Sequence, residues 1–410
     1  MKLRYTAAAL ATGAAVIAMA AYAQKGPDSG PVARYDMRAG TTSGFGGMAG
    51  GRPSMMSMMM GGGGSQVQHE LYLRLGSSSL PAKGKPAADH FMPATARLGK
   101  SVALATPTQE KGPTDEVPNF SERGQEPTGR ILIFWGCGEH APKGQPFVID
   151  LNKLYHGQIP AGQGPWTSTI LTDWGPNLTN SKTFGRWPAE DGKYVKSDSS
   201  LIGAHRVAGN YSPEMNFTLS KDFMQPLSVS VAAQKSGSSL LSWKGIPDTT
   251  GSVATLFGGK QGPNGAMGGD MVMWSSSASR QFGGGLSDWI SPAEAARLVG
   301  DKTLLAPATT QCLVPAEVIA AAPDFRLGTL TAFGPEEDFS YPPRPAEAKA
   351  RWDLQWTARI RHRSTTSWME AQGMSMGTAN GQGAQGAQGQ CKPKGGLLGG
   401  LKGALGGGNC

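Results

Sequence analysis

A thiol, a carboxylate and an imidazole lie within four residues of one another at Cys137, Glu139 and His140. A cysteine nucleophile needs a nearby histidine that generates the thiolate, and the same side chains are candidate zinc ligands. The remaining histidines show no paired spacing; they are His69, His90, His156, His205 and His362. The sequence therefore names no third member of a triad or metal site. A thiol- or metal-dependent enzyme centred on Cys137 and His140 stays an alternative.

Disulfide bonding is the competing explanation for Cys137. The chain has four cysteines, and an even number in an exported protein suggests disulfides with three possible connectivities. We prefer Cys137 with Cys312, and Cys391 with Cys410. The alternative is that Cys391 or Cys410 bonds another chain. We favour the disulfide over catalysis at Cys137, and we expect no cofactor.

The expectation of export rests on residues 1–23. Lys2 and Arg4 precede an uncharged, alanine-rich stretch, and Ala21-Tyr22-Ala23 offers the small residues that signal peptidase requires. The apolar stretch is shorter than the ~20 residues that cross a bilayer. The pattern predicts a cleaved signal peptide and a mature chain that begins at Gln24, with no later membrane span. The expected location is periplasmic, in the cell envelope, or secreted.

Three arginines, Arg359, Arg361 and Arg363, alternate along a predicted strand, so their side chains share one face. Such a face can bind phosphate, carboxylate or an anionic glycan, or it is a solvated strand surface. The net charge of +8 is spread along the chain. Because it forms no dense basic stripe, we expect no nucleic-acid partner.

A methionine cluster precedes the first strong strand pattern; it contains Met55, Met56, Met58, Met59 and Met60. Thioethers are soft donors that suit Cu(I), which makes copper binding a third alternative. No histidine or cysteine is interleaved with these methionines. We therefore favour a low-complexity segment in which methionine is one more flexible apolar residue, and we expect no metal.

The composition favours β-structure joined by long loops, because 59 glycines and 29 prolines accompany only 17% charged residues. Residues 67–75 alternate apolar and polar side chains, and residues 131–135 form a continuous apolar run. Ser291-Pro292-Ala293-Glu294 predicts the start of a short helix, as does Pro315-Ala316-Glu317. We predict a mainly β fold of two antiparallel β-sandwich-like units with short helical decorations.

The predicted domain organisation has five parts. They are a signal peptide at 1–23, a disordered Gly/Met-rich arm at 24–65, an N-terminal β-rich domain at 66–215, a β-sandwich domain at 216–370, and a disordered Gly/Leu-rich tail at 371–410. The arm and the tail are predicted to be disordered because their composition buries too little side chain to offset the entropy of ordering.

Residues 216–370 resemble the fibronectin type III module. A proline-led strand precedes Leu241-Ser242-Trp243, whose tryptophan stands in the place of that family's core tryptophan, and residues 327–334 resemble its penultimate strand. A large insertion at 258–311 departs from the family pattern. The resemblance implies a β-sandwich and little about function. The whole chain also resembles uncharacterised exported bacterial proteins, which implies no activity.

The leading functional expectation is a non-enzymatic envelope or extracellular protein with a binding or structural role. An envelope polymer, a glycan or another protein is the expected partner. The ten tryptophans add weight to glycan binding if several of them line one exposed face, because aromatic rings stack on sugars.

Overall fold

The computed structural model describes residues 30–45, 67–107, 128–158, 175–189, 194–261, 267–281, 286, 289–347, 350–371 and 374–376. The predicted signal peptide, the methionine cluster at 55–60, and Cys391 and Cys410 lie outside these residues.

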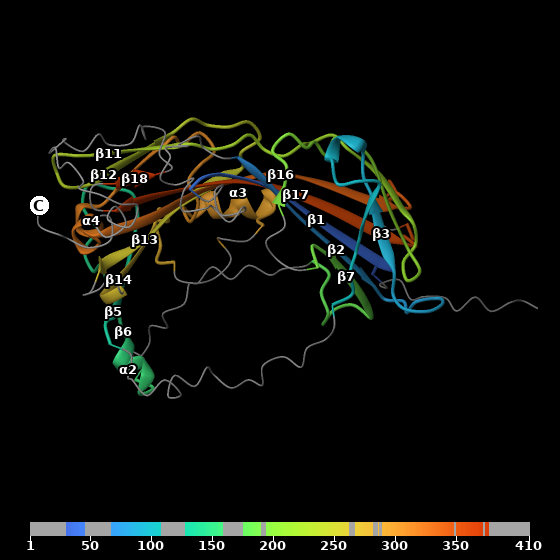
Figure 1. Ribbon diagram of the computed structural model, residues 1–410, viewed down its shortest axis with the longest axis horizontal. Coiled ribbons are helices and arrows are strands. Elements are labelled where there is room, and N and C mark those ends of the chain that lie inside the picture. Colours follow the sequence, from blue (N-terminus) through green and yellow to red (C-terminus); the bar gives the residue numbers. More distant parts are fainter. Residues whose placement is uncertain are drawn as a thin grey trace, which may run out of the picture.

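The prediction of a mainly β protein with short helices is confirmed (Figure 1). The described helices are α2 (Leu151–Tyr155), α3 (Pro292–Gly300), α4 (Ala316–Ala321) and the 3-10 turn η2 (Ala94–Ala96). α3 begins as the sequence indicates, since the Glu294 backbone N–H donates to Ser291 Oγ at 3.2 Å. This contact satisfies one of the donors that every helix start leaves open.

The described strands form one large sheet of 11 strands, in the order β6-β5-β14-β13-β16-β17-β1-β2-β7, with β8 beside β2 and β18 beside β17. They are β1 (Ala33–Gly44), β2 (Gln68–Ser77), β5 (Arg130–Trp135), β6 (Phe147–Asp150), β7 (Thr183–Trp187), β8 (Tyr194–Val195), β13 (Gly251–Gln261), β14 (Met267–Ser275), β16 (Phe325–Tyr341), β17 (Trp356–Ala371) and β18 (Met374–Met376). The pairs β1–β17 and β14–β5 are parallel, and the other pairs are antiparallel.

Two small sheets cover the two ends of the large sheet (Figure 1). One has the order β10-β9-β3-β4 and the other β11-β12-β15. Their strands are β3 (Ala88–Phe91), β4 (Ser101–Ala103), β9 (Gly203–Gly209), β10 (Met215–Leu219), β11 (Val229–Ala233), β12 (Ser239–Trp243) and β15 (Gln311–Val314). Each small sheet encloses its own apolar core against the large sheet.

The two cores do not follow the predicted division into residues 66–215 and 216–370. β5 and β6 come from the first of these ranges but pair beside β14, at the end that contains the second core. β17 comes from the second range and supplies Trp356, Ala358 and Ile360 to the first core. The reason is the length of β16 and β17, which are 17 and 16 residues long and cross both ends. The chain therefore forms two sandwiches that share one continuous sheet.

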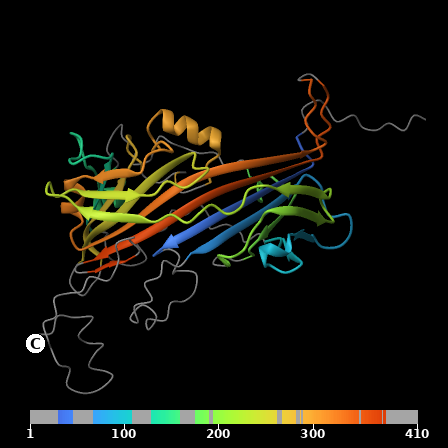
Figure 2. The same cartoon turned by 90° about the horizontal axis from the view of Figure 1, so that it is seen from above.

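β1 lies inside the segment 24–65 that was predicted to be a disordered arm, so that prediction is wrong for residues 33–44. β1 sits between β17 and β2 in the large sheet (Figure 2). Its Tyr35, Met37 and Ala39 side chains are buried on the core face. Its opposite face carries Asp36 and Arg38. The polar face is also covered, so the composition of β1 does not reveal its burial. Similarly, β18 lies within the predicted tail at 371–410.

An extended segment at residues 221–228 crosses from the first core to the second along the large sheet. Its backbone carbonyls accept hydrogen bonds from strand hydroxyls: Met224 O from Thr41 Oγ1 at 2.6 Å and Leu227 O from Ser43 Oγ at 2.6 Å. Ser364 Oγ donates in the same way to Gln225 O at 2.8 Å. These bonds explain why small hydroxyl side chains occupy buried strand positions, since buried carbonyl groups need partners.

Candidate functional site

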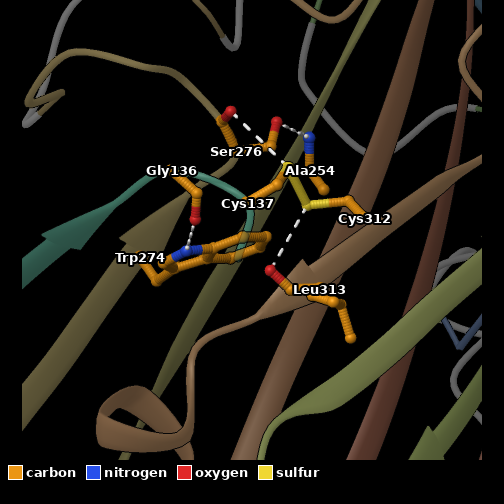
Figure 3. Close-up of a disulfide and its surroundings, with 7 residues drawn as sticks. All are labelled: Gly136, Cys137, Ala254, Trp274, Ser276, Cys312 and Leu313. Atoms are coloured by element: carbon orange, nitrogen blue, oxygen red, sulfur yellow. Dashed lines mark hydrogen bonds between the residues drawn. A yellow bond between two sulfur atoms is a disulfide. The ribbon is translucent and has the colours of Figure 1, made fainter. Parts of the chain in front are cut away.

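The cysteine cluster of the sequence is a disulfide site. Cys137 bonds Cys312, with 5.3 Å between their Cα atoms, so the preferred pairing is confirmed (Figure 3). Cys312 is buried on β15, and the neighbouring Trp274 indole donates through Nε1 to Gly136 O at 2.9 Å. The bond ties the loop after β5 to the small sheet that covers the second core.

His140 and Glu139 take no part in a catalytic arrangement with Cys137. The His140 side chain is two-thirds exposed, and its Nδ1 lies 3.1 Å from Glu317 Oε1 on α4. The Glu139 backbone carbonyl accepts from Ala316 N at 2.9 Å. The Cys137 sulfur is oxidised, so it offers no thiolate to an imidazole. Among the residues that the structure describes, no group of three or more His, Cys, Asp or Glu side chains could hold a metal ion.

A cluster of charged side chains lies on one face of β1, β2, β7 and β17, opposite the first core. We call this surface the arginine face; its charged side chains are Asp36, Arg38, Glu70, Arg74, Arg186, Arg359, Arg361 and Arg363. The predicted row of Arg359, Arg361 and Arg363 belongs to it, and anion binding by that row stays a prediction.

The centre of the arginine face is the carboxylate of Asp36, whose side chain is 1% exposed. Its Oδ2 accepts from Arg38 Nε at 3.0 Å and from Arg74 Nη2 at 2.8 Å. Its Oδ1 accepts from Arg359 Nη2 at 3.0 Å and from Arg361 Nη2 at 3.1 Å. Burial opposes ionisation, but the four guanidinium groups outweigh it and hold the pKa of Asp36 far below its usual range. The carboxylate is therefore charged at neutral pH.

A second acid, Glu336, completes this cluster from the β16 side. Its Oε2 lies 3.9 Å from Arg361 Nε. Burial and the neighbouring charge of Asp338 raise the pKa of Glu336 to about 7. Burial also lowers the pKa of Arg361; the charge of Asp36 opposes this effect, and the nearby guanidinium groups of Arg359 and Arg38 add to it. Like charges thus crowd one another on this face.

A pocket of about 230 Å³ opens on the arginine face beside this cluster. Of the described residues that line it, four are arginines and none is acidic; the set is Arg38, Arg74, Arg186, Arg363, Tyr72, Leu73, Trp187, Pro188 and Trp289. The four arginines come from β1, β2, β7 and β17. We call it the arginine pocket.

Trp289 covers one side of the arginine pocket and is held there by three contacts. The Arg363 guanidinium carbon lies 4.2 Å from the centroid of the Trp289 ring, and the Arg361 guanidinium donates to the Trp289 carbonyl. Beneath the ring lies Gly40, where a Cβ atom would sit only 3.0 Å from Trp289 Cη2. The small size of Gly40 lets the ring lie close to the sheet, because a Cβ atom here would crowd it.

Arg186 differs from the other pocket arginines because it lacks an ion pair among the described residues. Its Nη2 donates to Ala189 O at 2.8 Å. Within the described ranges it forms no ion pair, and its buried Nε has no hydrogen-bond acceptor. Leaving a buried charged donor without an acceptor is costly in free energy. The position of Arg186 is therefore consistent with a ligand acceptor in the pocket.

The sequence predicted Arg363 as a candidate site residue but missed Arg38, Arg74 and Arg186. Arg74 occupies a polar position of the alternating strand at 67–75. That position by itself predicts only a solvent-exposed side chain. Arg38 was assigned to the disordered arm. These residues meet because β1 pairs with both β2 and β17.

A second polar network lies in the first core, on the opposite side of β1. Tyr35 Oη lies 2.6 Å from His90 Nδ1, and His90 Nε2 lies 2.9 Å from His205 Nδ1. His205 Nε2 reaches the Leu201 carbonyl at 2.7 Å. Because that carbonyl only accepts, the hydrogen bonds assign N–H to Nε2 of both histidines and let Tyr35 donate. Burial lowers the pKa of both histidines and raises that of Tyr35. All three groups are neutral and partnered, as expected for a structural network.

A scan against protein-family models and searches of curated proteins and of solved structures found no match to this chain. The resemblance of residues 216–370 to the fibronectin type III module therefore stays a prediction. Among the described helices, none has the length and apolar character needed to cross a membrane.

Replacing Cys137 and Cys312 together by serine should lower the free energy of unfolding by ~2–4 kcal/mol, because the bond restricts the unfolded chain across 175 residues. Urea unfolding of the oxidised protein and of the double variant measures the difference. Equal unfolding midpoints with a free Cys137 thiol in the wild-type protein would contradict the disulfide.

Stability should decrease as the pH falls below ~6.5. Burial lowers the folded-state pKa of His69, His90, His205 and His362. Below the unfolded pKa the unfolded chain therefore binds more protons, and each group costs up to ~1.4 kcal/mol per pH unit. Glu336 acts in the opposite sense, because its raised pKa removes stability as the pH rises towards about 7.

Urea unfolding between pH ~5 and ~7.5 measures this dependence. The Glu336→Gln variant should show the steeper loss on acidification, because the opposing contribution is absent. A stability that does not change over this pH range would contradict neutral buried histidines.

Proposed function

We propose that this protein is an exported, non-enzymatic binding protein that holds an anionic ligand in the arginine pocket. The observation that carries the proposal is the arginine lining of the pocket, in which the buried Nε of Arg186 has no acceptor among the described residues. A partly enclosed set of guanidinium groups attracts an anion more strongly than the same groups would in open water.

The burial of the lining arginines supports a ligand site rather than a solvated strand face. The side chains of Arg38, Arg74 and Arg363 are only 12%, 19% and 18% exposed. They are anchored by Asp36 and Glu70, so their positions are set before a ligand arrives. A preorganised site loses less conformational entropy on binding.

The chemistry of the lining favours binding over catalysis. Apart from the Tyr72 phenol, the described lining residues include no nucleophile and no general base. Cys137, the candidate nucleophile of the sequence, is held in the disulfide with Cys312. A binding role in the periplasm, in the cell envelope or outside the cell also suits a protein with a disulfide, because such bonds persist in oxidising compartments.

Export is the part of this proposal that residues 1–23 support. Expression of the full-length chain in a bacterial host should yield a mature protein that begins at Gln24, because Ala21 and Ala23 fit signal peptidase. Intact mass and N-terminal sequencing of the periplasmic and culture fractions test this. A cytosolic protein that retains residues 1–23 would contradict export.

Arg186→Ala should weaken the binding of small anions by about tenfold, corresponding to ~1.4 kcal/mol. Benzoate, phenyl sulfate and phenyl phosphate are suitable probes, titrated by calorimetry and by tryptophan fluorescence, because Trp187 and Trp289 line the pocket. Removing the guanidinium removes the donor that lacks an acceptor.

The matched control is Arg206→Ala, which changes the net charge equally but lies outside the pocket. Arg206 lies 3.8 Å from the Phe91 ring centroid and pairs with Glu214 at 3.1 Å. The Arg206→Ala protein should bind the three probes with the same affinity as the wild-type protein. If no probe binds, or if both variants bind equally well, the arginine pocket is not an anion site.

A further inference from the structure

We infer that the arginine pocket recognises a phosphate monoester carried on a ring or a similarly small apolar group. This inference rests on the proposed function, since it names the class of anion that the pocket takes.

The number of guanidinium groups in the lining favours an anion with several acceptor oxygens. Arg38, Arg74, Arg186 and Arg363 stand on four different strands, and Trp289 closes the side above Arg363. The three terminal oxygens of a phosphate monoester accept hydrogen bonds from more of these groups than the two oxygens of a carboxylate do. A carboxylate presents two oxygens in one plane, and bidentate guanidinium pairing to it is likewise planar.

The crowding of positive charge favours a dianion over a monoanion. Arg359 and Arg38 are close enough to Arg361 to lower the pKa of its guanidinium. Four arginines share the carboxylate of Asp36, and Glu336 and Glu70 are the other acids that contact arginines of this face. An anion held at Arg38 and Arg74 would relieve this repulsion in proportion to its charge. A phosphate monoester carries nearly two negative charges at pH ~7, whereas a carboxylate or a sulfate monoester carries one.

The remaining lining suggests what the phosphate is attached to. A bare phosphate ion would leave much of the 230 Å³ empty. The rest of the lining is Tyr72, Leu73, Trp187, Pro188 and Trp289, of which Leu73 and Trp187 belong to the first core. Tyr72, Pro188 and Trp289 supply rings and apolar atoms. Such walls fit a sugar ring, an aromatic ring or the glycerol of a lipid headgroup. The shared chemistry of these ligands is the phosphate monoester beside a compact group.

The test is calorimetric titration of the full-length mature protein with phenyl phosphate, phenyl sulfate and benzoate. All three carry a phenyl ring, and the first two differ only in the acid group. Phenyl phosphate should bind about tenfold more tightly than either of the others. Its advantage over benzoate should grow as the pH rises through ~6, where the second phosphate proton is lost. Taking the ratio to benzoate cancels titrations that belong to the protein. In Arg186→Ala the advantage should shrink, whereas Arg206→Ala should keep it.

Vesicle sedimentation distinguishes two sources of the phosphate monoester, a lipid headgroup and a soluble phosphorylated molecule. Phosphatidylcholine vesicles with phosphatidic acid carry a phosphate monoester, and vesicles with phosphatidylglycerol carry only a diester. Sedimentation of the protein with the first kind alone assigns the ligand to a lipid headgroup; binding of phenyl phosphate without sedimentation assigns it to a soluble phosphorylated molecule. Either result agrees with the inference.

Phenyl sulfate or benzoate binding as tightly as phenyl phosphate would overturn the phosphate monoester while leaving an anion site in place. Binding of none of the three probes would instead overturn the proposed function itself. The two failures are therefore distinguishable in one series of titrations.

Discussion

The buried carboxylate of Asp36 is the interaction on which the large sheet depends. It binds arginines from its own strand β1, from β2 and from β17, and β1 is the element that joins these two neighbours in the described sheet. Burying one carboxylate among guanidinium groups gives little net stability, because every charge loses its hydration. It does specify register, since a one-residue slip of β1 would turn Asp36 into the apolar core.

β1 is covered on both faces, by apolar side chains on one and by charged side chains and Trp289 on the other. One face places Tyr35, Met37 and Ala39 in the first core, and the other meets arginines and Trp289. The apolar face supplies the stability of packing, and the charged face supplies a site whose side chains are held by their neighbours. The same strand therefore connects the fold to the pocket. The site cannot move far without loss of the core beneath it.

Three features connect the sandwich that contains the second core to the one that carries the arginine pocket. β16 and β17 are long enough to enter both cores, so the two sandwiches cannot shift independently. The segment at 221–228 joins them along the sheet through its bonded carbonyls. The disulfide closes the far end, where it fixes the loop after β5 to β15. These links make a rigid support for a pocket formed by four strands.

The sequence by itself determined the β class and the start of α3, because alternation and capping are local signals. Cysteine parity left three connectivities, of which Cys137 with Cys312 was preferred, and the structure decided for that pair. Only the tertiary structure decided which strands pair. Asp36 meets Arg359 across 323 residues, and no local pattern encodes that contact. β1 was mistaken for a disordered arm because its polar face is buried by charge pairing rather than by apolar side chains. The arginine pocket follows from the same pairing, which is why sequence found one wall of it and missed the others.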